Sequence, residues 1–500
     1  MKYSGSFVCI GACRRVIIFV AVITFLFPVF AANAYVELDP DFGTGGVVSR
    51  DFTPEDDRAK TCFLDEQGRI VVVGSYGGMP LIARFNSDGT YDGYVTGVFP
   101  EEDFSGCIDS SGQIFVTGSV DGDTVPGGTT TSNWNFALKG YDQDFGGSEQ
   151  QEKDFEGRGD YCYACAVTSD DKVIMVGEAG ISGTDTDFGL VIYDFADAGD
   201  PLQNSVTTDL GWGNEQAYAV AVDNEGRIVV GGKSENGFPS SECDFALARY
   251  NSDGSIDDTF GSGGIVSTDF NGNQDVITSV AIDHEDKIVA AGYAKTEAGT
   301  NINFALARYN TDGTLDTTFG EDGTGKVFTH IDSTSDYIHS CVIDRQGRIV
   351  VAGKTGTASA ADFVLARYTS DGNLDPDFNP DGDGGYLLEN ISSNEGANSC
   401  LIDEQGRIVV AGYSDGPGAD NRVVILRYLT DYSDPPTGDD DDDFVPPVTD
   451  DDDDVITTPD DEEIETEDDE LPEGDSGCSM ISLSGIMAIL VVPLLLLLKK

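Results

Sequence analysis

A hairpin-like block recurs seven times along this chain, and no other feature constrains the fold so strongly. The clearest copy runs from Val280 to Gly292 and consists of an alternating apolar stretch, a short polar turn and a second stretch rich in β-branched residues. Equivalent blocks, mostly about 60 residues apart, turn at Gly68, Gly112, Asp171, Gly226, Asp286, Gly347 and Gly406. Each block has the pattern of a β-hairpin, so the sequence predicts one supersecondary unit repeated seven times.

Every unit also contains a third and a shorter fourth run of strand-forming residues. The third runs are Leu81–Phe85, Phe136–Tyr141, Phe188–Tyr193, Phe245–Tyr250, Phe304–Tyr309, Phe363–Tyr368 and Val423–Tyr428. The fourth runs are Val47–Phe52, Val98–Phe104, Gln151–Phe155, Val206–Leu210, Ile265–Phe270, Val327–Ile331 and Leu387–Ile391. Seven units of four strands predict an all-β fold, a seven-bladed β-propeller of four-stranded antiparallel blades over residues 35–434.

The order of the runs also predicts how the ring closes. The first run, Val47–Phe52, is of the fourth type, whereas the last, Val423–Tyr428, is of the third type. If the fourth run is outermost, the N-terminal segment completes the last blade and joins the two ends of the propeller.

The repeat resembles a known family. Leu315-Asp-Thr-Thr-Phe-Gly320, then a fourth run, the Val-Ala-Ile-Asp and Arg-Ile-Val-Val-Ala-Gly runs of the hairpin, and Phe-Ala-Leu-Ala-Arg-Tyr-Asn-x-Asp-Gly recur in fixed order over residues 38–432. This order is similar to delta-60 repeats, a bacterial surface repeat that looks like NHL-type propellers. Units two and three depart from the pattern, because the Leu-Asp-x-x-Phe-Gly segment is lost after Gly89 and Gly140-Tyr141-Asp142 replaces the usual end of the third run. The resemblance implies a fold and an exterior location, and it implies no catalytic residues.

The N-terminal segment has the features of a secretory signal. Lys2, Arg14 and Arg15 precede an apolar run that ends near Phe30, and Ala32-Asn33-Ala34 follows. Residues 1–34 are therefore predicted to be a signal peptide that signal peptidase cleaves after Ala34. The alternative is an uncleaved anchor helix.

The C-terminal segment has three parts. Residues 435–477 are rich in Asp and Glu without Lys or Arg, and like charges in series predict a disordered acidic linker. Gly477-Cys478 then precedes an apolar stretch, Met480–Leu498, and Lys499-Lys500. Residues 478–500 resemble the sorting tails of bacterial surface proteins, which implies a membrane sorting protease that cuts near Cys478. A plain transmembrane helix held in the membrane by the terminal lysines is the competing interpretation.

Composition excludes one class of partner. The chain has 90 Asp and Glu against 28 Lys and Arg, a net charge of −62, so repulsion disfavours nucleic acid and anionic membrane surfaces. Seven cysteines remain between the two terminal segments, and an odd number argues against a full disulfide framework.

Three copies of an Asn-x-Asp-Gly-x-x-Asp segment are the candidates for a metal site. Oxygen side chains around a glycine turn suit Ca²⁺, but the longer loop and distal Glu of an EF-hand are absent. A simple Asx turn explains the same residues without an ion and is the favoured interpretation. The weak Ca²⁺ candidates are Asp88, Asp92, Asp253, Asp257, Asp312 and Asp316; no other cofactor is indicated.

A basic residue in the third run and an acid before the hairpin turn also recur, which predicts one structural ion pair or Arg-to-carbonyl bond per blade. The basic residues are Arg84, Lys139, Arg249, Arg308, Arg367 and Arg427, and the acids are Asp65, Asp109, Asp223, Asp283, Asp344 and Asp403. The chain has only three histidines, His284, His330 and His339, and none lies in a recognised catalytic motif.

These features favour an exported binding or adhesion module at the bacterial cell surface or envelope, anchored by its C-terminus, with an extracellular protein or glycan as ligand. Its partner-contacting loops are expected at Asp121–Trp134, Gly180–Asp187, Glu235–Cys243 and Lys295–Asn303. An extracellular hydrolase or lyase that acts on polysaccharide at the channel mouth is the first alternative, for which a tight carboxylate pair would be the sign. A structural envelope protein without a ligand is the second.

Overall fold

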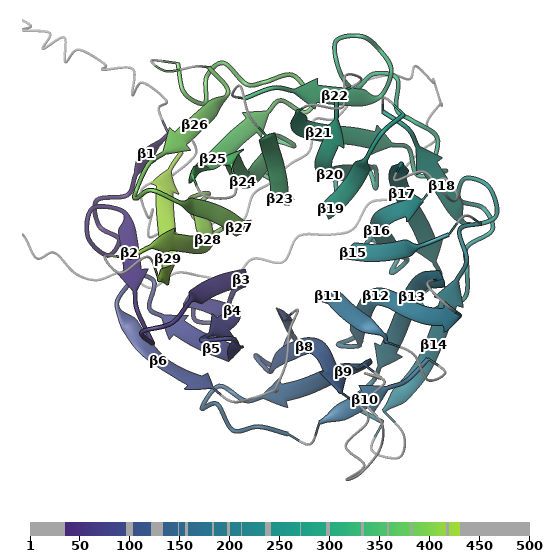
Figure 1. Ribbon diagram of the computed structural model, residues 1–500, viewed down its shortest axis with the longest axis horizontal. Helices are drawn as coiled ribbons and strands as arrows, with labels where there is room; N and C mark the ends of the chain where they lie inside the picture. The colour runs from purple at the N-terminus through teal and green to yellow at the C-terminus, as the bar shows by residue number, and fades with distance from the viewer. Residues whose placement is uncertain are drawn as a thin grey trace, which may run out of the picture. The chain divides into compact units, whose positions relative to one another are not determined.

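The computed structural model describes residues 36–430, except for 97–103, 122–133, 149, 156–158, 183–184, 198–200, 212, 236–241, 271, 297–300, 332–334, 358–359, 381, 383 and 417–419. Its strands form seven antiparallel sheets arranged radially around a centre (Figure 1), so the predicted seven-bladed propeller is confirmed. The predicted signal peptide, acidic linker and C-terminal segment lie outside the described residues.

Each blade consists of strands that follow one another along the chain. Blades 1 to 3 contain β3 (Asp57–Leu64), β4 (Ile70–Tyr76), β5 (Met79–Phe85) and β6 (Tyr91–Thr96); β7 (Ser105–Ile108), β8 (Ile114–Asp121), β9 (Trp134–Tyr141) and β10 (Gln151–Lys153); and β11 (Tyr161–Val167), β12 (Val173–Ser182), β13 (Asp185–Tyr193) and β14 (Leu202–Thr208). Blades 4 to 6 contain β15 (Glu215–Val222), β16 (Ile228–Glu235), β17 (Cys243–Tyr250) and β18 (Ile265–Thr268); β19 (Asp275–Ile282), β20 (Ile288–Lys295), β21 (Ile302–Tyr309) and β22 (Lys326–Thr329); and β23 (Ser335–Ile343), β24 (Ile349–Thr357), β25 (Ala360–Tyr368) and β26 (Tyr386–Glu389).

The seventh blade joins the two ends of the described chain. It contains β27 (Glu395–Ile402), β28 (Ile408–Asp415) and β29 (Asn421–Leu429), and its outer edge comes from β1 (Glu37–Leu38) and β2 (Val47–Arg50). Val47 pairs with Leu426, and Glu37 pairs with Leu429. The predicted closure is therefore confirmed, and β27 contacts β3 to complete the ring of innermost strands.

One strand lies earlier than the sequence predicted. The fourth strand of blade 1 was expected at Val98–Phe104, but the structure has it at β6, residues Tyr91–Thr96. In blades 4 to 7 a Leu-Asp-x-x-Phe-Gly segment or a close variant of it separates the third strand from the fourth. Because this segment is missing after Gly89, the fourth strand follows the turn directly. Blade 2, an expected irregular blade, has the shortest inner and outer strands of blades 1 to 6, with β7 at 4 residues and β10 at 3.

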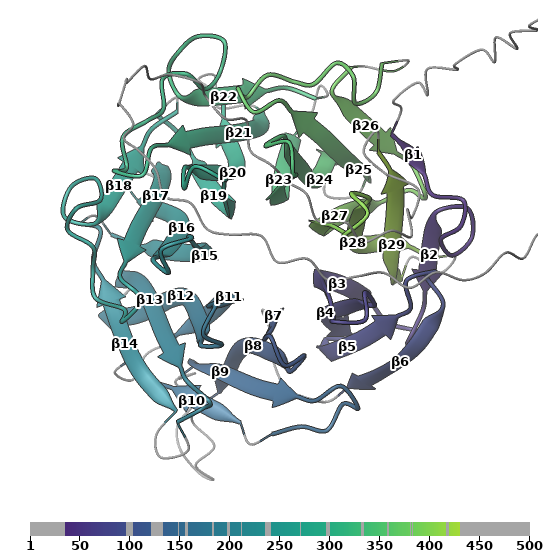
Figure 2. The same cartoon turned by 180° about the vertical axis from the view of Figure 1, so that it is seen from behind.

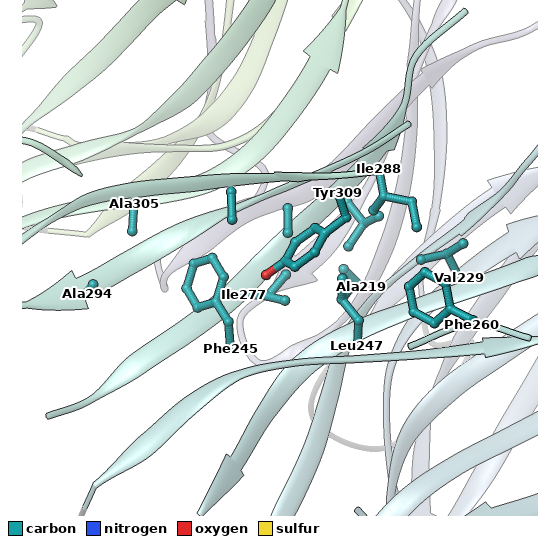
Figure 3. Packing of buried hydrophobic residues seen from close by; sticks show 13 residues of the cluster. Ala219, Val229, Phe245, Leu247, Phe260, Ile277, Ile288, Ala294, Ala305 and Tyr309 are labelled. Carbon is teal, nitrogen blue, oxygen red and sulfur yellow. The ribbon is translucent and has the colours of Figure 1, made fainter. Parts of the chain in front are cut away.

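The core lies between the blades, because both faces of each sheet are covered by its neighbours. Between blades 4 and 5, Phe245 and Leu247 from β17 face Ile277 from β19 and Tyr309 from β21 (Figure 3). Six equivalent clusters fill the other interfaces. This two-sided burial explains why the runs are apolar on both faces.

The Leu-Asp-x-x-Phe-Gly segment fastens each blade to the next. In blade 4, Arg249 Nε donates to Asp257 Oδ2 at 2.8 Å, and its guanidinium lies 4.5 Å from the centre of the Phe260 ring. The same arginine donates from Nη1 to the carbonyl of Thr311 in blade 5. The predicted ion pair per blade therefore exists at Arg84, Arg249, Arg308, Arg367 and Arg427.

The partner of that arginine is not the acid that the sequence suggested. In four blades the acid before the hairpin turn instead pairs with the arginine four residues later, as in Asp223 with Arg227 at 2.6 Å. Sequence alone could not choose between the two acids, because the choice depends on which turn faces the third strand.

No helix among the described residues is long and apolar enough to cross a membrane. None of the seven cysteines among the described residues forms a disulfide: Cys62, Cys107, Cys162, Cys165, Cys243, Cys341 and Cys400.

Candidate functional site: the central channel

A cavity of about 660 Å³ lies on the axis of the propeller. Its lining comes from the innermost strands of every blade, β3, β7, β11, β15, β19, β23 and β27, with Phe104 just before β7 and side chains from β20 and β24. Figure 2, the view from behind, shows these strands around the centre. A concave site of this size can hold a ligand of a few sugar rings.

A β-bulge supplies the side chains that line this channel. In six innermost strands the register shifts by one residue at the same place, which leaves one extra residue without a pairing partner. The six bulged residues, which all line the cavity, are Lys60, Tyr163, Tyr218, Thr278, His339 and Asn398. The bulge recurs in six blades, whereas the side chain at the bulge differs between blades. A binding site in a repeated fold requires such differences, because identical side chains would give a symmetric lining.

The glycine that ends each second run makes the bulge sterically possible. A Cβ at Gly353 of β24 would lie 1.9 Å from the carbonyl oxygen of Tyr337, two residues before the bulge at His339. The same approach, at 2.0 Å or less, occurs at Gly74, Gly177, Gly232, Gly292 and Gly412. The glycine of the Ile-Val-Val-Ala-Gly motif therefore leaves room for the bulge whose side chain lines the channel.

Hydrogen bonds between blades hold three of the bulged side chains. Thr278 Oγ1 donates to the carbonyl of Ile338 at 2.6 Å, and Asn398 Nδ2 donates to that of Ala59 at 2.7 Å. His339 Nδ1 lies 2.7 Å from the carbonyl of Ala397. In each case the acceptor precedes the bulge of the next blade, so these bonds connect and preorganise the part of the lining that runs from blade 5 to blade 1.

His339 is neutral at pH 7. Burial lowers the pKa of His339 to about 4, and the positive charges of Lys354 and Lys60 add to this effect, whereas the bond to Ala397 opposes it. Because Nδ1 faces a carbonyl oxygen, this nitrogen carries the proton, and Nε2 keeps its lone pair as an acceptor.

The charge of the lining is opposite to that of the whole chain. Among the described residues that line the cavity there is no Asp or Glu, although the chain has 90 of them. Lys60 is exposed on β3, and Lys354 projects from β24. Burial lowers the pKa of Lys354, and the nearby charge of Arg58 lowers it further. A bound anion would stabilise the charged form of Lys354 and so raise its pKa again.

Aromatic rings form the other part of the lining. The rings of Tyr163 and Tyr218 lie 5.1 Å apart, and those of Tyr293 and Tyr337 lie 5.0 Å apart. Lys354 Nζ lies 5.5 Å from the centre of the Tyr337 ring. The hydroxyl of Tyr218 donates to the side-chain oxygen of Gln216, and the side-chain nitrogen of Gln216 donates to Glu178. The channel therefore combines stacking surfaces with positive charge.

The six Ca²⁺ candidates lie away from the channel, and the protein already occupies their carboxylates. Three of them accept hydrogen bonds from the residue two positions later, an Asx-turn geometry: Asp88 from Thr90, Asp253 from Ser255 and Asp312 from Thr314. The other three pair with the third-strand arginines: Asp92 with Arg84, Asp257 with Arg249 and Asp316 with Arg308.

The remaining residues singled out from the sequence are dispersed. His284 lies in the turn after β19, and His330 follows β22, so only His339 of the three histidines reaches the channel. The four expected contact loops fall partly or largely outside the described residues. So do the processing positions Ala34, Gly477 and Cys478.

Sequence reasoning missed a buried carboxylate that begins the inner strand of most blades. Six such acids are fully buried, and each accepts a backbone N–H from a residue four or five positions earlier: Asp57, Asp160, Glu215, Asp275, Asp336 and Glu395. The signal was present as an acid five residues after the Phe, Leu or Ile that ends the fourth run, except in blade 7, where the spacing is four. The bulged residues left no comparable signal, because their side chains differ.

Comparison with known proteins agrees with the repeat architecture. Residues 68–92, 225–260, 286–319 and 347–378 match a family model described as a domain of unknown function (DUF5122) beta-propeller. Each segment runs from an inner hairpin turn through the third strand to the turn beyond it. The chain is thus similar to a family of propeller repeats, while the delta-60 name stays a prediction. No curated protein matches the sequence.

Several solved structures are similar to this chain at low sequence identity. An ulvan lyase from a new family of polysaccharide lyases is 12% identical with a TM-score of 0.44 and covers 77% of this chain and 96% of its own. Virginiamycin B lyase from Staphylococcus aureus is 10% identical with a TM-score of 0.41, over 76% of this chain and 98% of its own. A Dyadobacter fermentans protein of unknown function is 12% identical with a TM-score of 0.41, over 78% and 100%. These likenesses concern the fold and carry no argument about activity.

Proposed function

We propose that the protein is an exported, surface- or membrane-tethered binding module whose central channel takes an anionic ligand, with the uronate units of an acidic glycan as the best-fitting class. The observation that carries this proposal is the charge reversal. The described lining offers Lys60 and Lys354 and no carboxylate, in a chain with a net charge of −62.

The lining suits an acidic sugar better than a simple inorganic anion. Tyrosine rings give flat apolar surfaces against which the CH faces of sugar rings can stack. His339 Nε2 and the free amide oxygen of Asn398 accept hydrogen bonds from hydroxyl groups, whereas the lysines attract the carboxylate. The cavity of about 660 Å³ is large enough for such a ligand.

The test is titration of the full-length chain with galacturonate oligomers and with neutral galactose oligomers of the same length, by isothermal calorimetry. We expect binding of the uronate chain that weakens with salt, because the ion pairs are partly screened. Lys354→Met keeps the length of the side chain and removes its charge, and this variant should lose most of the uronate binding.

The matched control is Lys326→Met, which makes the same charge change on the outermost strand β22. This variant should bind like the wild type. Equal binding of uronate and neutral chains, or equal loss in both variants, would show that the channel charge does not select the ligand.

A lyase is the second candidate function, and the observation that favours it is that His339, Lys354 and tyrosine side chains line the same channel. β-Elimination in a uronate chain needs a base that removes the proton next to the carboxylate, a cation near that carboxylate and a donor to the leaving oxygen. His339 Nε2, Lys354 and a channel tyrosine offer these groups. Hydrolysis of a glycosidic bond would need a pair of carboxylates, and the described lining contains none.

The two functions are separated by incubation of the protein with a uronate polymer. A lyase gives an unsaturated product that absorbs in the ultraviolet, and His339→Gln should abolish this absorbance while the polymer still binds. A binding module leaves the polymer intact. An envelope protein without a ligand would show neither result.

We also propose that the mature chain starts after Ala34 and is anchored at the cell envelope by its C-terminal segment. The supporting observations are the small-x-small site and the apolar stretch Met480–Leu498. Cell fractionation with intact mass spectrometry tests this proposal. A surface product that ends near Cys478 supports sorting, whereas an inner-membrane product that retains Lys500 supports a plain anchor.

A further inference from the structure

The junctions between blades contain a second kind of polar site, outside the channel lining. At each junction three positions are equivalent: the residue before the apolar part of the third strand, the residue before the last one of the fourth run, and the buried acid at the start of the next inner strand. Between blades 4 and 5 these are Asp244, Asp269 and Asp275. Between blades 5 and 6 they are Asn303, His330 and Asp336.

Most of these junctions satisfy their acid with protein groups. Between blades 5 and 6, Asp336 Oδ1 accepts the hydroxyl of Thr355 at 2.5 Å, and His330 Nδ1 lies 3.4 Å from its Oδ2 and 3.2 Å from Asn303. Between blades 6 and 7, Asn390 donates to Asp362 at 3.1 Å, and Ser392 donates to Glu395. Between blades 7 and 1, Thr53 donates to Asp57.

The junction between blades 4 and 5 satisfies its acids only in part: Ser267 Oγ donates to Asp244 Oδ2 at 3.3 Å, and the N–H of Phe270 donates to Asp275 Oδ2 at 2.7 Å. One carboxylate oxygen from each of Asp244, Asp269 and Asp275 lies within 4.8 Å of the other two. Asp244 is 7% exposed and Asp275 is fully buried, and the Oδ1 atoms of both are buried without a hydrogen-bond partner. In blade 6 Asp336 pairs with Thr355, whose hydroxyl binds the acid. In blade 5 Asp275 pairs with Ala294, so this hydroxyl is missing.

We propose that Asp244, Asp269 and Asp275 bind a divalent cation of the calcium type. Calcium prefers oxygen ligands at about 2.4 Å, so two ligands of one ion lie at most about 4.8 Å apart, as these carboxylates do. The two buried Oδ1 atoms have no proton donor, and a cation would compensate for this. A hard cation such as Ca²⁺ binds carboxylate oxygens, and water and main-chain oxygens would complete its coordination shell. Lys326 Nζ donates to the main-chain carbonyl of Asp269 at 3.0 Å.

The ionisation of the cluster agrees with this arrangement. Burial raises the pKa of Asp275 to about 6, and the charges of Asp269 and Asp244 raise it further, while the N–H of Phe270 opposes the rise. A cation at the site would reverse the effect of the neighbouring carboxylates.

A second cluster of the same kind lies between blades 3 and 4. Carboxylate oxygens of Asp187, Asp209 and Glu215, at the equivalent three positions, also lie within 4.8 Å of one another. Burial raises the pKa of Asp187 to about 6, and the charge of Asp209 adds to the rise. None of these three side chains has a buried oxygen without a hydrogen-bond partner, and Glu215 and Asp209 accept the N–H groups of Leu210 and Gly211. The proposal is therefore confined to the junction between blades 4 and 5 and uses none of the Asn-x-Asp-Gly turns.

The test is the thermal unfolding of the full-length chain in EDTA, in CaCl₂ and in MgCl₂, with ionic strength matched by NaCl. We expect Ca²⁺ to raise Tm well beyond the effect of the salt control. Asp244→Asn introduces the amide that Asn303 provides at the next junction. This variant should have a higher Tm than the wild type in EDTA and a smaller calcium shift.

Asp244→Asn combined with Asp269→Asn removes two of the three charged ligands and should abolish the calcium shift that this site causes. Asp362→Asn, at a junction where Asn390 already binds the carboxylate, is the matched control and should keep the full shift. All variants retain the acidic linker, so calcium bound there contributes equally to each.

If the double variant fails to fold, Asp269→Asn, which changes an exposed carboxylate of the cluster, replaces it together with calorimetric counting of bound Ca²⁺. We expect this variant to lose one bound ion. An unchanged Tm of the wild type in CaCl₂, or the same calcium shift in the wild type and the double variant, would overturn the proposal.

Discussion

The link between the strand glycine and the channel bulge can be tested at Gly353. In Gly353→Ala the new Cβ would lie 1.9 Å from the carbonyl oxygen of Tyr337 and 3.0 Å from the Cα of Ile338. Ordinary contacts of a Cβ begin at 3.4 Å. Because the obstacle is backbone, no rotamer change relieves it, and the inner strand must move by more than an ångström.

The cost of this movement follows from the contacts that it breaks. Two ladder hydrogen bonds next to the bulge contribute about 1 kcal/mol each, and the overpacked strand adds about 1–3 kcal/mol. The expected destabilisation of the propeller is thus about 3–5 kcal/mol, the sum of these contributions. The same movement displaces His339 and its bond to Ala397, so uronate binding should fall as well.

Urea unfolding, followed by circular dichroism, measures the loss of stability, and calorimetry measures the loss of binding. Gly93→Ala on the outer strand β6 is the control, because its Cβ meets only Phe145 at 3.5 Å and its φ is not positive. This variant should be neutral or slightly stabilised. If Gly353→Ala unfolds within about 0.5 kcal/mol of the wild type, the glycine does not serve the bulge and the reasoning is wrong.

Three further predictions concern the buried charges and the closure. Asp257→Asn leaves the guanidinium of Arg249, which is 2% exposed, without its counter-charge, so urea unfolding should show a loss of about 3–5 kcal/mol; a loss below about 1 kcal/mol would contradict this. Because the pKa of His339 is about 4 in the fold and 6.5 is its ordinary value, the unfolded chain binds more protons between these values and the fold loses stability as the pH falls. His339→Gln removes this effect, so between pH 7.5 and pH 5 its stability relative to the wild type should improve by on the order of 2 kcal/mol, and an unchanged difference would refute the neutral histidine. Subtracting the wild-type values cancels the opposite effect of Asp160, Asp187 and Asp275, whose pKa values burial raises to about 6. Deletion of residues 36–50 removes both outer strands of blade 7 and the fully buried Phe42, so the chain should become sensitive to proteolysis at low protease concentration; resistance equal to the wild type would show that the closure is dispensable.

Much of the architecture could be predicted, because it is repeated. Apolar alternation and turn residues are local signals, and seven copies of them made the number of blades and the strand order readable. Even the closure by Val47–Phe52 followed from the order of the runs. The exception, Val98–Phe104, arose where one copy had lost the Leu-Asp-x-x-Phe-Gly segment, so that the spacing of the other copies no longer applied.

The candidate site could not be predicted in the same way. Lys60, Tyr163 and His339 occupy equivalent positions in their blades, but they are different types of residue. In a single sequence, equivalent positions are recognised by repetition of the residue type, so these residues could not be recognised as one set. The pairing of Arg249 with Asp257 instead of Asp223 also depended on which turn faces the third strand. The acids Asp244, Asp269 and Asp275 lie up to 31 positions apart along the chain, and only the packing of adjacent blades brings their carboxylates together.

The sequence by itself determined the repeat, the β-hairpins, the number of blades and the excess of acid, because each of these depends on local composition and spacing. The tertiary structure decided which side chains face the axis, which acids are buried between blades and which of them lack a partner. These properties depend on a one-residue bulge and on contacts between blades, and a shift of one residue reverses the face of a strand on which a side chain lies.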